Sequence, residues 1–407
     1  MRRPLFVSIE VLKYLKENRE EHLTQLKEFL SIPSISSELN YKEDVVKAAK
    51  WTAQALKDAG IENISVMETP KHPVVYGEWL HAEDAPTVLI YGHYDVQPVD
   101  PIELWETPPF EPTIRDNKLY ARGSSDDKGQ VFMQIKVIEA IMKTEGKLPV
   151  NVKFIYEGEE EIGSPSLEPF VEDHKELLKA DILLVSDTTL IAEGQPSICH
   201  GLRGLTGLQI DIKGPTSDLH SGLYGGAVQN PLHALSELLA TMHDEHGHVS
   251  IKGFYDKVEE LTSEEIETYA KLSDDEELKK YLQVEDLFGE AGFSTKARLW
   301  GRPTLEINGI WGGYQGEGIK TVIPSEAHAK ITCRLVPAQD PAEIAELIQK
   351  HIKEHLPKGV TVTTTLFDQA KPFVTPYQHP AIQAAGASLE KGYGKETIYT
   401  RMGGSVP

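Results

Sequence analysis

The chain has few of the residues that mark several protein classes. Its 407 residues contain only Cys199 and Cys333, so we expect no disulfide framework and a reducing compartment. Lysine and arginine total 41 against 63 acidic residues, and the net charge of −22 argues against nucleic acid or an anionic membrane as a partner. No apolar run approaches the roughly 20 residues of a membrane-spanning helix, and Glu10 comes too early for a secretion signal. These absences predict a cytoplasmic protein.

Alternating strand and helix patterns predict a doubly wound α/β layer in the first half of the chain. Helical spacing of apolar residues covers 8–30 and 45–60, and a third helix is expected over 131–141. Short apolar runs rich in β-branched residues predict buried strands, which fall at 87–91, 151–156 and 181–185. The length allows one large domain or two ordinary ones.

The pattern changes at Gly204, where longer strands begin. The expected elements are strands at 204–213, 321–336 and 359–366, a helix at 230–242 and an acidic helical region at 255–290. Residues 371–377 have the composition of a linker, and a new helix is expected to begin at His379. This organisation predicts two domains, the second inserted into the first.

The stretch Tyr-Gly-His93-Tyr-Asp95-Val follows the apolar run at 87–91. In an open α/β sheet, ligands collect beyond the carboxyl ends of strands. His93 and Asp95 are two residues apart, so their side chains leave an extended chain on the same side. An imidazole there can bind a metal while the carboxylate orients a ligand or a water. A histidine at a strand end is also commonly a hydrogen-bonded loop residue, and the pair alone leaves both interpretations open.

Three further acidic motifs follow in the next hundred residues. Asp126 and Asp127 lie between two glycines where a helix opens, although a single Asp there is also a favoured N-cap. A run of three glutamates ends at Glu161, after the strand predicted at 151–156, although such a run can be a solvated charged face. Asp187 follows a fourth apolar segment. Clustered carboxylates repel one another, so cationic side chains or a divalent metal are expected nearby. One histidine with several carboxylates suits zinc, manganese or cobalt.

Together these motifs resemble those of one family of dinuclear metallopeptidases. The family holds carnosinases and related dipeptidases, aminoacylases, acetylornithine deacetylase and succinyl-diaminopimelate desuccinylase. The matching segments occur in family order and span roughly residues 20–407: Gly92-His93-Tyr-Asp95-Val, Arg122-Gly-Ser-Ser-Asp126-Asp127-Lys-Gly, Glu160-Glu161-Ile-Gly-Ser, Val185-Ser-Asp187, Ser217-Asp-Leu-His220-Ser-Gly, Thr321-Val-Ile-Pro, Cys333-Arg334-Leu-Val-Pro and Gly403-Gly-Ser405-Val-Pro. The segment 311–318, Trp-Gly-Gly-Tyr-Gln-Gly-Glu-Gly, is most similar to the carnosinase-type dipeptidases.

The resemblance implies a fold and a domain arrangement. The catalytic domain is expected to be a doubly wound α/β layer with a mixed sheet, formed by 1–203 and 379–407. Residues 204–378 are expected to form an inserted α+β lid of the ferredoxin-like type, through which two subunits form a homodimer.

The resemblance also implies two divalent metal ions per subunit, with zinc as the expected metal and manganese or cobalt as alternatives. Asp126 is expected to bridge the ions. His93 and Asp187 are expected as further ligands of one ion, and Glu161 as a ligand of the other. Two ions about 3.5–4 Å apart can share a hydroxide, polarise a carbonyl and stabilise a tetrahedral oxyanion. The peptide bond after the bridging aspartate is often cis in relatives.

Glu160 is expected to be the general base, which takes a proton from the attacking water and gives it to the leaving amine. Asp95 is expected to orient His93 and to raise its basicity. The assignment of the glutamates depends on the Gly-Ser that follows them. A shift of one place would make the pair Glu159 and Glu160.

Four residues in the later motifs are expected to contact the substrate. His220 resembles the histidine that reaches the active site of the second subunit and stabilises the oxyanion. It is also one of 15 histidines and can be an ordinary surface-loop residue. Arg334 matches the arginine that binds the terminal carboxylate of the substrate through a bidentate fork. Thr321 and Ser405 are expected to add hydroxyl contacts.

The sequence departs from the family at its end. Relatives supply a second histidine ligand for the Glu161 ion some tens of residues after the Gly-Gly-Ser motif, whereas this sequence stops at Pro407. His379 lies where the family has no ligand. We expect a truncated version of a longer chain, and a degenerate member is the alternative.

The expected partner is a small peptide, and the expected activity is metal-dependent hydrolysis of dipeptides or other short substrates with a free C-terminal carboxylate. The same chemistry serves an N-acyl-amino-acid amidohydrolase, which only the substrate pocket distinguishes. A non-catalytic, metal-binding dimer is the alternative from another class.

Overall fold

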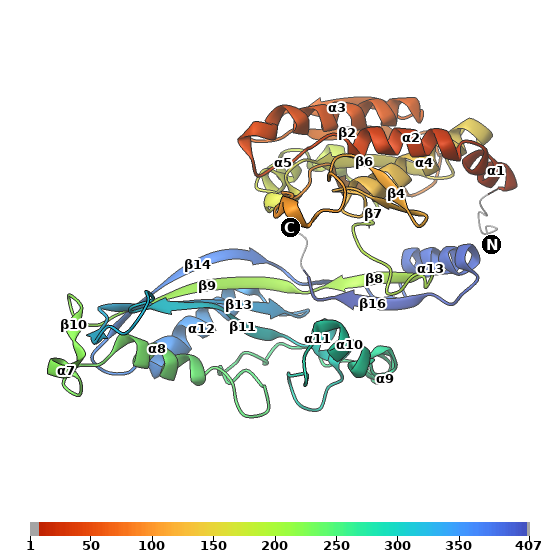
Figure 1. Cartoon of the computed structure of the whole chain (residues 1–407). Helices are drawn as coiled ribbons and strands as arrows, with labels where there is room; N and C mark the ends of the chain where they lie inside the picture. The colour runs from red at the N-terminus through yellow and green to blue at the C-terminus, as the bar shows by residue number, and fades with distance from the viewer. Residues whose placement is uncertain (1–7, 405–407) are drawn as a thin grey trace. The chain divides into compact units, whose positions relative to one another are not determined.

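The computed structural model describes residues 8–404, which form two compact units divided between Thr189 and Leu190 (Figure 1). No helix within the described residues is long and apolar enough to cross a lipid bilayer. The predicted domains follow a different partition, 1–203 with 379–407 against 204–378, and their boundaries stay a prediction.

The first unit is built on a mixed five-stranded sheet, as predicted. Its strands lie in the order β1 (Glu62–Met67), β2 (Val74–Trp79), β6 (Asn151–Glu157), β3 (Thr87–His93) and β7 (Ile182–Val185). β6, β3 and β7 are parallel, whereas β1 pairs antiparallel with β2 and β2 pairs antiparallel with β6. The carboxyl ends of the three parallel strands therefore meet at one edge of the sheet, where ligands collect in α/β folds.

Helices cover both faces of this sheet. One face packs against α2 (Arg19–Leu30), α3 (Lys42–Asp58) and α4 (Lys128–Glu145), and α1 (Ile9–Glu17) packs against α4. The other face packs against α5 (Leu167–Asp173) and α6 (Lys175–Leu178). Ile90 of β3 belongs to the first core and Tyr91 to the second, because successive strand residues point to opposite faces. Burial on both faces explains why these strands are continuous apolar runs.

Two elements of the first unit differ from the sequence prediction. The helix expected over 8–30 is two helices, because Asn18 ends α1 and its side chain bonds the carbonyl of Tyr14 at 2.8 Å. β3 runs past Tyr91 to His93, since its pairing with β6 continues through Gly92. A Cβ atom at Gly92 would lie 2.6 Å from a methyl carbon of Val131 in α4, so the glycine allows that helix to approach the strand end.

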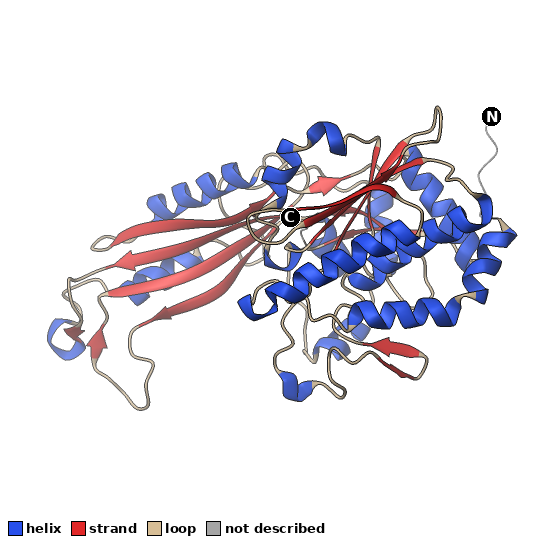
Figure 2. Ribbon diagram, turned by 90° about the horizontal axis from the view of Figure 1, so that it is seen from above, coloured by secondary structure: helices blue, strands red, loops and turns tan. Residues whose placement is uncertain are grey.

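The second unit contains a four-stranded antiparallel sheet. In chain order its elements are β9 (Gly204–Lys213), α8 (Pro231–Ala240), β11 (Thr304–Gly312), β13 (Glu326–Leu335), α12 (Pro341–His355) and β14 (Thr361–Ala370). The strands lie in the order β11, β13, β9, β14, and both helices pack on one face (Figure 2). This β-α-β-β-α-β arrangement is ferredoxin-like, as predicted. The sequence pattern does not predict β11, because its alternation is broken where its register with β13 shifts, between Ile307 and Gly309.

Shorter elements flank this sheet at its two ends (Figure 1). At one end β10 (Leu219–His220) pairs with β12 (Val322–Ile323) and leads into α7 (Ser221–Tyr224). At the other end β8 (Ser197–Leu202) pairs with β15 (Phe373–Val374) and β16 (Ile398–Met402), and α13 (Pro380–Tyr393) packs against β8. The acidic region forms α9 (Ser263–Leu272) and α10 (Asp275–Leu282), followed by α11 (Thr295–Gly301). β15 occupies part of the predicted linker, and His379 caps α13 as expected.

Candidate metal centre

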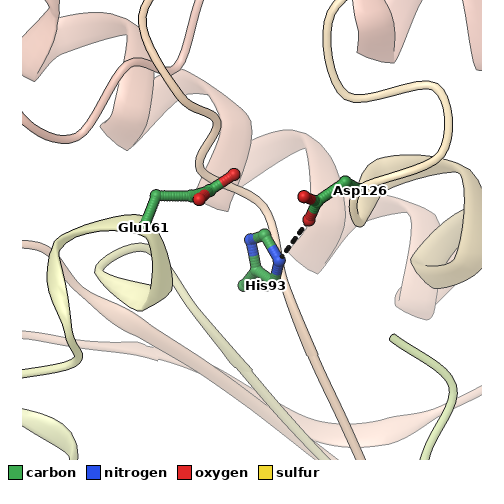
Figure 3. Close-up of side chains that lie close together, drawn as sticks. All are labelled: His93, Asp126 and Glu161. Carbon is green, nitrogen blue, oxygen red and sulfur yellow. Dashed lines mark hydrogen bonds and ion pairs between the residues drawn. The ribbon is translucent and has the colours of Figure 1, made fainter. Parts of the chain in front are cut away.

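The imidazole of His93 lies at the centre of a group of carboxylates. His93 is the last residue of β3 and is fully buried. Its Nε2 atom lies 3.1 Å from Oδ1 of Asp126, 3.6 Å from Oδ2 of Asp187 and 3.9 Å from Oε2 of Glu160. The contact with Asp126 is a hydrogen bond (Figure 3). Segments that are far apart in the chain therefore converge on one nitrogen atom.

Two groups of three side chains can each hold a metal ion. One group is His93, Asp126 and Glu161, and the other is His93, Glu160 and Asp187. Within each group the candidate ligand atoms lie within 4.8 Å of one another. Figure 3 shows the first group, with the Glu161 and Asp126 carboxylates on either side of the His93 ring. The structure thus brings all four predicted ligands together, and it places the predicted base, Glu160, in the same cluster.

Asp95 connects His93 to the turn that carries the glutamates. Its Oδ1 atom lies 3.3 Å from Nδ1 of His93, whereas Asp126, Asp187 and Glu160 lie near the other ring nitrogen, Nε2. Its Oδ2 atom accepts a hydrogen bond from the backbone N–H of Glu161 at 3.1 Å. Asp95 is fully buried. This position fits the orienting role predicted for Asp95.

The two neighbouring aspartates have different surroundings. Asp127 is the N-cap residue of α4 and is fully buried, and its Oδ2 atom accepts a hydrogen bond from the backbone N–H of His93 at 3.0 Å. The Asp126 side chain is 62% exposed. The peptide bond between the two residues is cis. Asp127 therefore ties the helix start to the strand end, and Asp126 presents its carboxylate to the open side of the centre.

Glu159 stabilises the turn after β6 through hydrogen bonds to neighbouring segments. Its carboxylate accepts hydrogen bonds from Oγ1 of Thr69 at 3.1 Å, from the backbone N–H of His72 at 2.8 Å and from that of Ser166 at 3.0 Å. Glu159 is 2% exposed. Both oxygens of Glu159 thus accept hydrogen bonds from other protein groups, whereas Glu160 and Glu161 lie beside the His93 imidazole.

Burial changes the proton affinities at the centre. It raises the pKa of Asp127 to about 7 and that of Glu160 to about 7. Burial also lowers the pKa of His93, but the neighbouring carboxylates, first among them Asp126, outweigh it and raise this pKa well above its usual 6.5. The hydrogen bond with His93 lowers the pKa of Asp126. The centre therefore favours additional positive charge.

These residues fit a divalent metal centre. Oδ1 of Asp95 and Oδ1 of Asp127 are buried and have no hydrogen-bond donor among residues 8–404. Acids with raised pKa around one imidazole indicate a site that is short of positive charge. One imidazole nitrogen with several carboxylate oxygens is a ligand set that suits zinc and similar ions. The donor set fits the two ions that the family resemblance implies.

The predicted substrate residues lie in the second unit, apart from Ser405, which is outside the described residues. His220 and Thr321 are in contact, with 3.3 Å between Nε2 and Oγ1. Nδ1 of His220 accepts a hydrogen bond from the backbone N–H of Gly222 at 3.0 Å. This bond leaves Nε2 as the nitrogen that faces outwards beside the Thr321 hydroxyl.

His220 and Arg334 lie towards opposite ends of the four-stranded sheet of the second unit. Strand β12, which pairs with His220, comes just before Glu326 at the start of β13, whereas Arg334 is near the end of that strand. At 3.2–3.4 Å per residue, the eight residue steps from Glu326 to Arg334 span roughly 26 Å. Burial and the proximity of Arg334 lower the pKa of Arg203 to about 10, and Arg203 bonds the carbonyl of Gly403 at 3.2 Å. The segment leading to the predicted Ser405 therefore lies at the Arg334 end.

Two residues of the centre, Gln97 and Asp127, were not assigned a role from the sequence. Gln97 donates from Nε2 to Oε2 of Glu161 at 2.8 Å and to its carbonyl at 3.2 Å. Gln97 follows His93 and Asp95 at the same two-residue spacing, so the alternation of an extended chain could have indicated it. Asp127 has no role in the sequence assignment, because a contact with a backbone N–H leaves no pattern in the sequence.

Comparisons with known proteins identify the family of the chain. The model of the family described as Peptidase family M20/M25/M40 matches residues 89–406. The chain is 31% identical to the Cys-Gly metallodipeptidase dug1 of Schizosaccharomyces pombe, over 98% of this chain and 87% of the relative. It is 32% identical to the human Beta-Ala-His dipeptidase, over 98% of this chain and 82% of the relative. The crystal structure of the M20 family metallo-carboxypeptidase Sso-CP2 from Sulfolobus solfataricus matches with a TM-score of 0.82 and 38% identity, covering 95% of this chain and 87% of that one. The resemblance found in the sequence is confirmed, and the chain belongs to the peptidase family M20/M25/M40.

Proposed function

We propose that the protein is a metal-dependent dipeptidase that hydrolyses dipeptides or other short substrates with a free C-terminal carboxylate. The observation that carries this conclusion is the convergence of Asp126, Asp187 and Glu160 on one buried imidazole, at 3.1–3.9 Å. Two relatives named as dipeptidases support a dipeptide as the substrate. Cys199 and Cys333 are both free, which supports action in a reducing compartment such as the cytoplasm.

The proposed cofactor is a pair of divalent ions per subunit, with zinc favoured over manganese or cobalt. Asp126 would bridge the pair, with His93 and Asp187 on one side and Glu161 on the other. When bound, the ions supply positive charge that polarises the scissile carbonyl and makes water more acidic. The Asp126 side chain is 62% exposed and contacts the fully buried His93, and this position supports the bridging assignment.

Glu160 is the proposed general base. Its side chain is 16% exposed and lies beside the ligands without a hydrogen bond to His93. Burial raises its pKa to about 7, which is near the value that suits proton transfer at neutral pH. The Glu160 carboxylate would take a proton from the attacking water and deliver it to the leaving nitrogen. Asp95 would keep the His93 ring in place during these steps.

The substrate residues support a homodimer in which each subunit completes the other's site. Arg334 is proposed to bind the terminal carboxylate, and Ser405 is proposed to add a hydroxyl contact. His220, with Thr321 beside it, is proposed to stabilise the oxyanion. β13 spans roughly 26 Å between Glu326, at the end that follows the partner strand of His220, and Arg334. One subunit therefore cannot bring His220 and Arg334 to the same small substrate. A second copy can supply His220.

The exposed edge of the lid sheet is a candidate surface for this dimer. β11 is an edge strand, and no strand of residues 8–404 pairs with its outer side. Ile307 is 41% exposed and Ile310 is 56% exposed on this strand. An unpaired strand with exposed apolar residues is a template for pairing with another chain. In a symmetric dimer the same edge would meet itself.

Hydrolysis assays with a substrate panel test the proposal. The protein, supplied with zinc or manganese, is incubated with Cys-Gly, β-Ala-His and Ala-Ala, and with the corresponding N-acetyl amino acids. Cleavage of dipeptides over acyl-amino acids is expected. Preferential cleavage of the acyl-amino acids would instead establish a deacylase, and metal binding without any hydrolysis would establish the non-catalytic alternative.

A further inference from the structure

Arg203 is a buried arginine without an acidic partner. It lies between β8 and β9 and is 8% exposed. Within residues 8–404 its guanidinium forms no ion pair with a carboxylate. By contrast Arg302, in the same unit, is 4% exposed and pairs with Glu290 at 2.7 Å. Because an unpaired charge inside a protein costs free energy, Arg203 is a candidate to bind an anionic group of a ligand.

Backbone carbonyls fix the orientation of the Arg203 side chain. Nε donates a hydrogen bond to the carbonyl of Gly403 at 3.2 Å, and Nη1 donates to that of Arg302 at 3.3 Å. The backbone N–H of Arg203 donates to the carbonyl of Met402 at 3.2 Å. Among the described residues, Nη2 has no acceptor. One amino group of a planar, well-held guanidinium therefore remains to donate to a ligand.

Gly403 allows the backbone to lie directly against this guanidinium. A Cβ atom at Gly403 would lie 2.7 Å from Nη2 of Arg203 and 3.0 Å from the carbonyl oxygen of Leu299. A larger residue would therefore push the guanidinium away from the segment 402–404. This is the segment that leads to the predicted substrate residue Ser405.

The strand register places Arg203 and Arg334 on the same face of the four-stranded sheet. Arg334 of β13 is directly opposite Leu205 of β9, and opposed residues point to the same face. Arg203 comes two residues before Leu205, so the alternation along the chain gives it the same side. Helices α8 and α12 pack on the other face, which carries Leu208 and Cys333. The two arginines therefore share the face away from these helices.

Arg334 is close enough to Arg203 to affect its charge. Burial and, second, the positive charge of Arg334 lower the pKa of Arg203 to about 10. Arg334 is half-buried, so a ligand can reach it from solvent. An anion bound to both groups would offset the repulsion between them. A carboxylate suits this position, because its two oxygens can accept hydrogen bonds from two guanidinium groups.

We propose that Arg203 is a second residue of the site that binds the C-terminal carboxylate, acting with Arg334. The inference rests on the proposed function, in which Arg334 binds this carboxylate. All of the protein groups involved belong to the second unit. Nη2 of Arg203 donates to a carboxylate oxygen, and Nε keeps the Gly403 backbone beside it. With two arginines, the site discriminates against substrates whose terminus carries no charge, such as peptide amides.

Peptides that differ only in the terminal charge test this inference. Ala-Ala and its C-terminal amide are titrated calorimetrically into the zinc-loaded Glu160→Gln protein, which is expected to bind without turnover. The affinity for the free acid should exceed that for the amide by roughly 100-fold. Arg203→Gln in the same background should lower this ratio about tenfold. Arg203→Lys should lower it by about threefold, because an ammonium keeps the charge but lacks the planar fork.

Lys330→Gln is the matched control. Lys330 is an exposed cation on the same face of β13, four residues before Arg334, or roughly 13 Å away along the strand. Its removal lowers the positive charge of this face without touching the arginines, so the ratio should equal that of the parent protein. In the active protein, Arg203→Gln should raise KM for Ala-Ala far more than it lowers kcat, because Arg203 does not contact the scissile bond.

The ratio of acid to amide affinity decides the inference. Urea unfolding identifies the variants that are folded. An unchanged ratio in Arg203→Gln, or in Arg203→Lys where the Gln variant does not fold, would overturn the role of Arg203. N-acetyl-alanine and its amide form a second pair with the same terminal group. Binding of this pair without binding of the dipeptides would contradict the proposed dipeptidase function, and its ratio would still measure the contribution of Arg203. Absence of binding by all four compounds would contradict both.

Discussion

Nε2 of His93 and Oδ1 of Asp126 lie 3.1 Å apart, although 33 residues separate them in the chain. His93 ends a buried strand, and Asp126 lies just before the first turn of α4. Gly92 permits this contact, because a Cβ atom there would lie 2.8 Å from Oδ2 of Asp127. The position of the Asp126 carboxylate therefore depends on the packing of a helix start against a strand end as well as on its own side chain.

The first prediction is that Asp126→Ala lowers metal binding and abolishes dipeptide hydrolysis. The bridging carboxylate would be lost from both proposed ion sites. Affinity should fall by more than the roughly 10–100-fold that loss of an outer-shell partner costs. Metal content after gel filtration, measured by elemental analysis, checks this. Full occupancy in Asp126→Ala would refute the ligand assignment.

Glu160→Gln is the matched comparison for this experiment. It keeps the shape of the side chain and removes only the ability to accept the proton. Bound metal should be retained, and kcat should fall roughly 10²–10⁴-fold. Loss of metal from Glu160→Gln would instead identify Glu160 as a ligand, which its place in a group with His93 and Asp187 allows.

The second prediction separates Glu159 from its neighbours. Glu159→Ala would leave the backbone N–H groups of His72 and Ser166 without their acceptor, and buried unsatisfied groups cost about 1–3 kcal/mol each. Glu159→Gln keeps one acceptor oxygen and should cost less. Urea unfolding at neutral pH measures both variants. If Glu159→Gln abolished turnover without loss of stability, the shifted assignment, with Glu159 in a chemical role, would be correct.

Much of the centre could be predicted from the sequence because its residues occur where strands end. His93, Glu161 and Asp187 lie at or just beyond the ends of β3, β6 and β7, and parallel strands place such positions at one edge of the sheet. Asp126 lies instead just before α4, where the flanking glycines and the apolar spacing indicate the start of a helix. The ferredoxin-like order of the lid followed from the family resemblance. The assignments of individual roles came from the same source and stay predictions.

Contacts made through the backbone could not be predicted from the sequence. Glu159 and Asp127 look like further members of acidic runs, but their carboxylates bind backbone N–H groups of other segments. Asn18 divides a helix whose apolar spacing continues on both sides of it. Tertiary packing decides each of these cases, and local sequence patterns do not report it.

The third prediction concerns a buried acid away from the centre. Glu139 of α4 accepts hydrogen bonds from Tyr14 at 2.8 Å and Lys136 at 2.5 Å, and lies 3.3 Å from His22. Burial raises the pKa of Glu139, but the bonds from Lys136 and Tyr14 outweigh it and lower this pKa below its usual 4.5. The stabilisation is therefore complete above the unfolded-state pKa and is lost as pH falls through the lower folded-state value.

Glu139→Gln should accordingly lower the free energy of unfolding by about 1–3 kcal/mol at pH 7. The difference from the unmodified protein should shrink as the pH falls below about 4.5. Urea unfolding at a series of pH values measures this. Glu145→Gln, at the exposed end of the same helix, should change stability by less than about 0.5 kcal/mol at every pH. A pH-independent difference for Glu139→Gln would show that its charge contributes nothing.

The last prediction tests whether His220 serves a second subunit. His220→Ala keeps the proposed base, Glu160, and Glu160→Gln keeps His220, so neither homodimer should turn over substrate. In a mixed dimer, one site receives an intact Glu160 from its own subunit and an intact His220 from the other. Equal mixing makes half of the dimers mixed, each with one working site of two, so activity should recover to about a quarter of that of the unmodified protein.

The measurement compares activity before and after the two variants are unfolded together and refolded, because refolding from a mixture lets the subunits associate at random. Gel filtration of each variant checks that the dimer itself is retained. His220 lies beside β12, which precedes β13, whereas Arg334 lies near the far end of β13, so this result is expected if both act on one substrate. Activity of the refolded mixture no higher than that of either parent would mean that His220 acts in its own subunit or takes no part in catalysis.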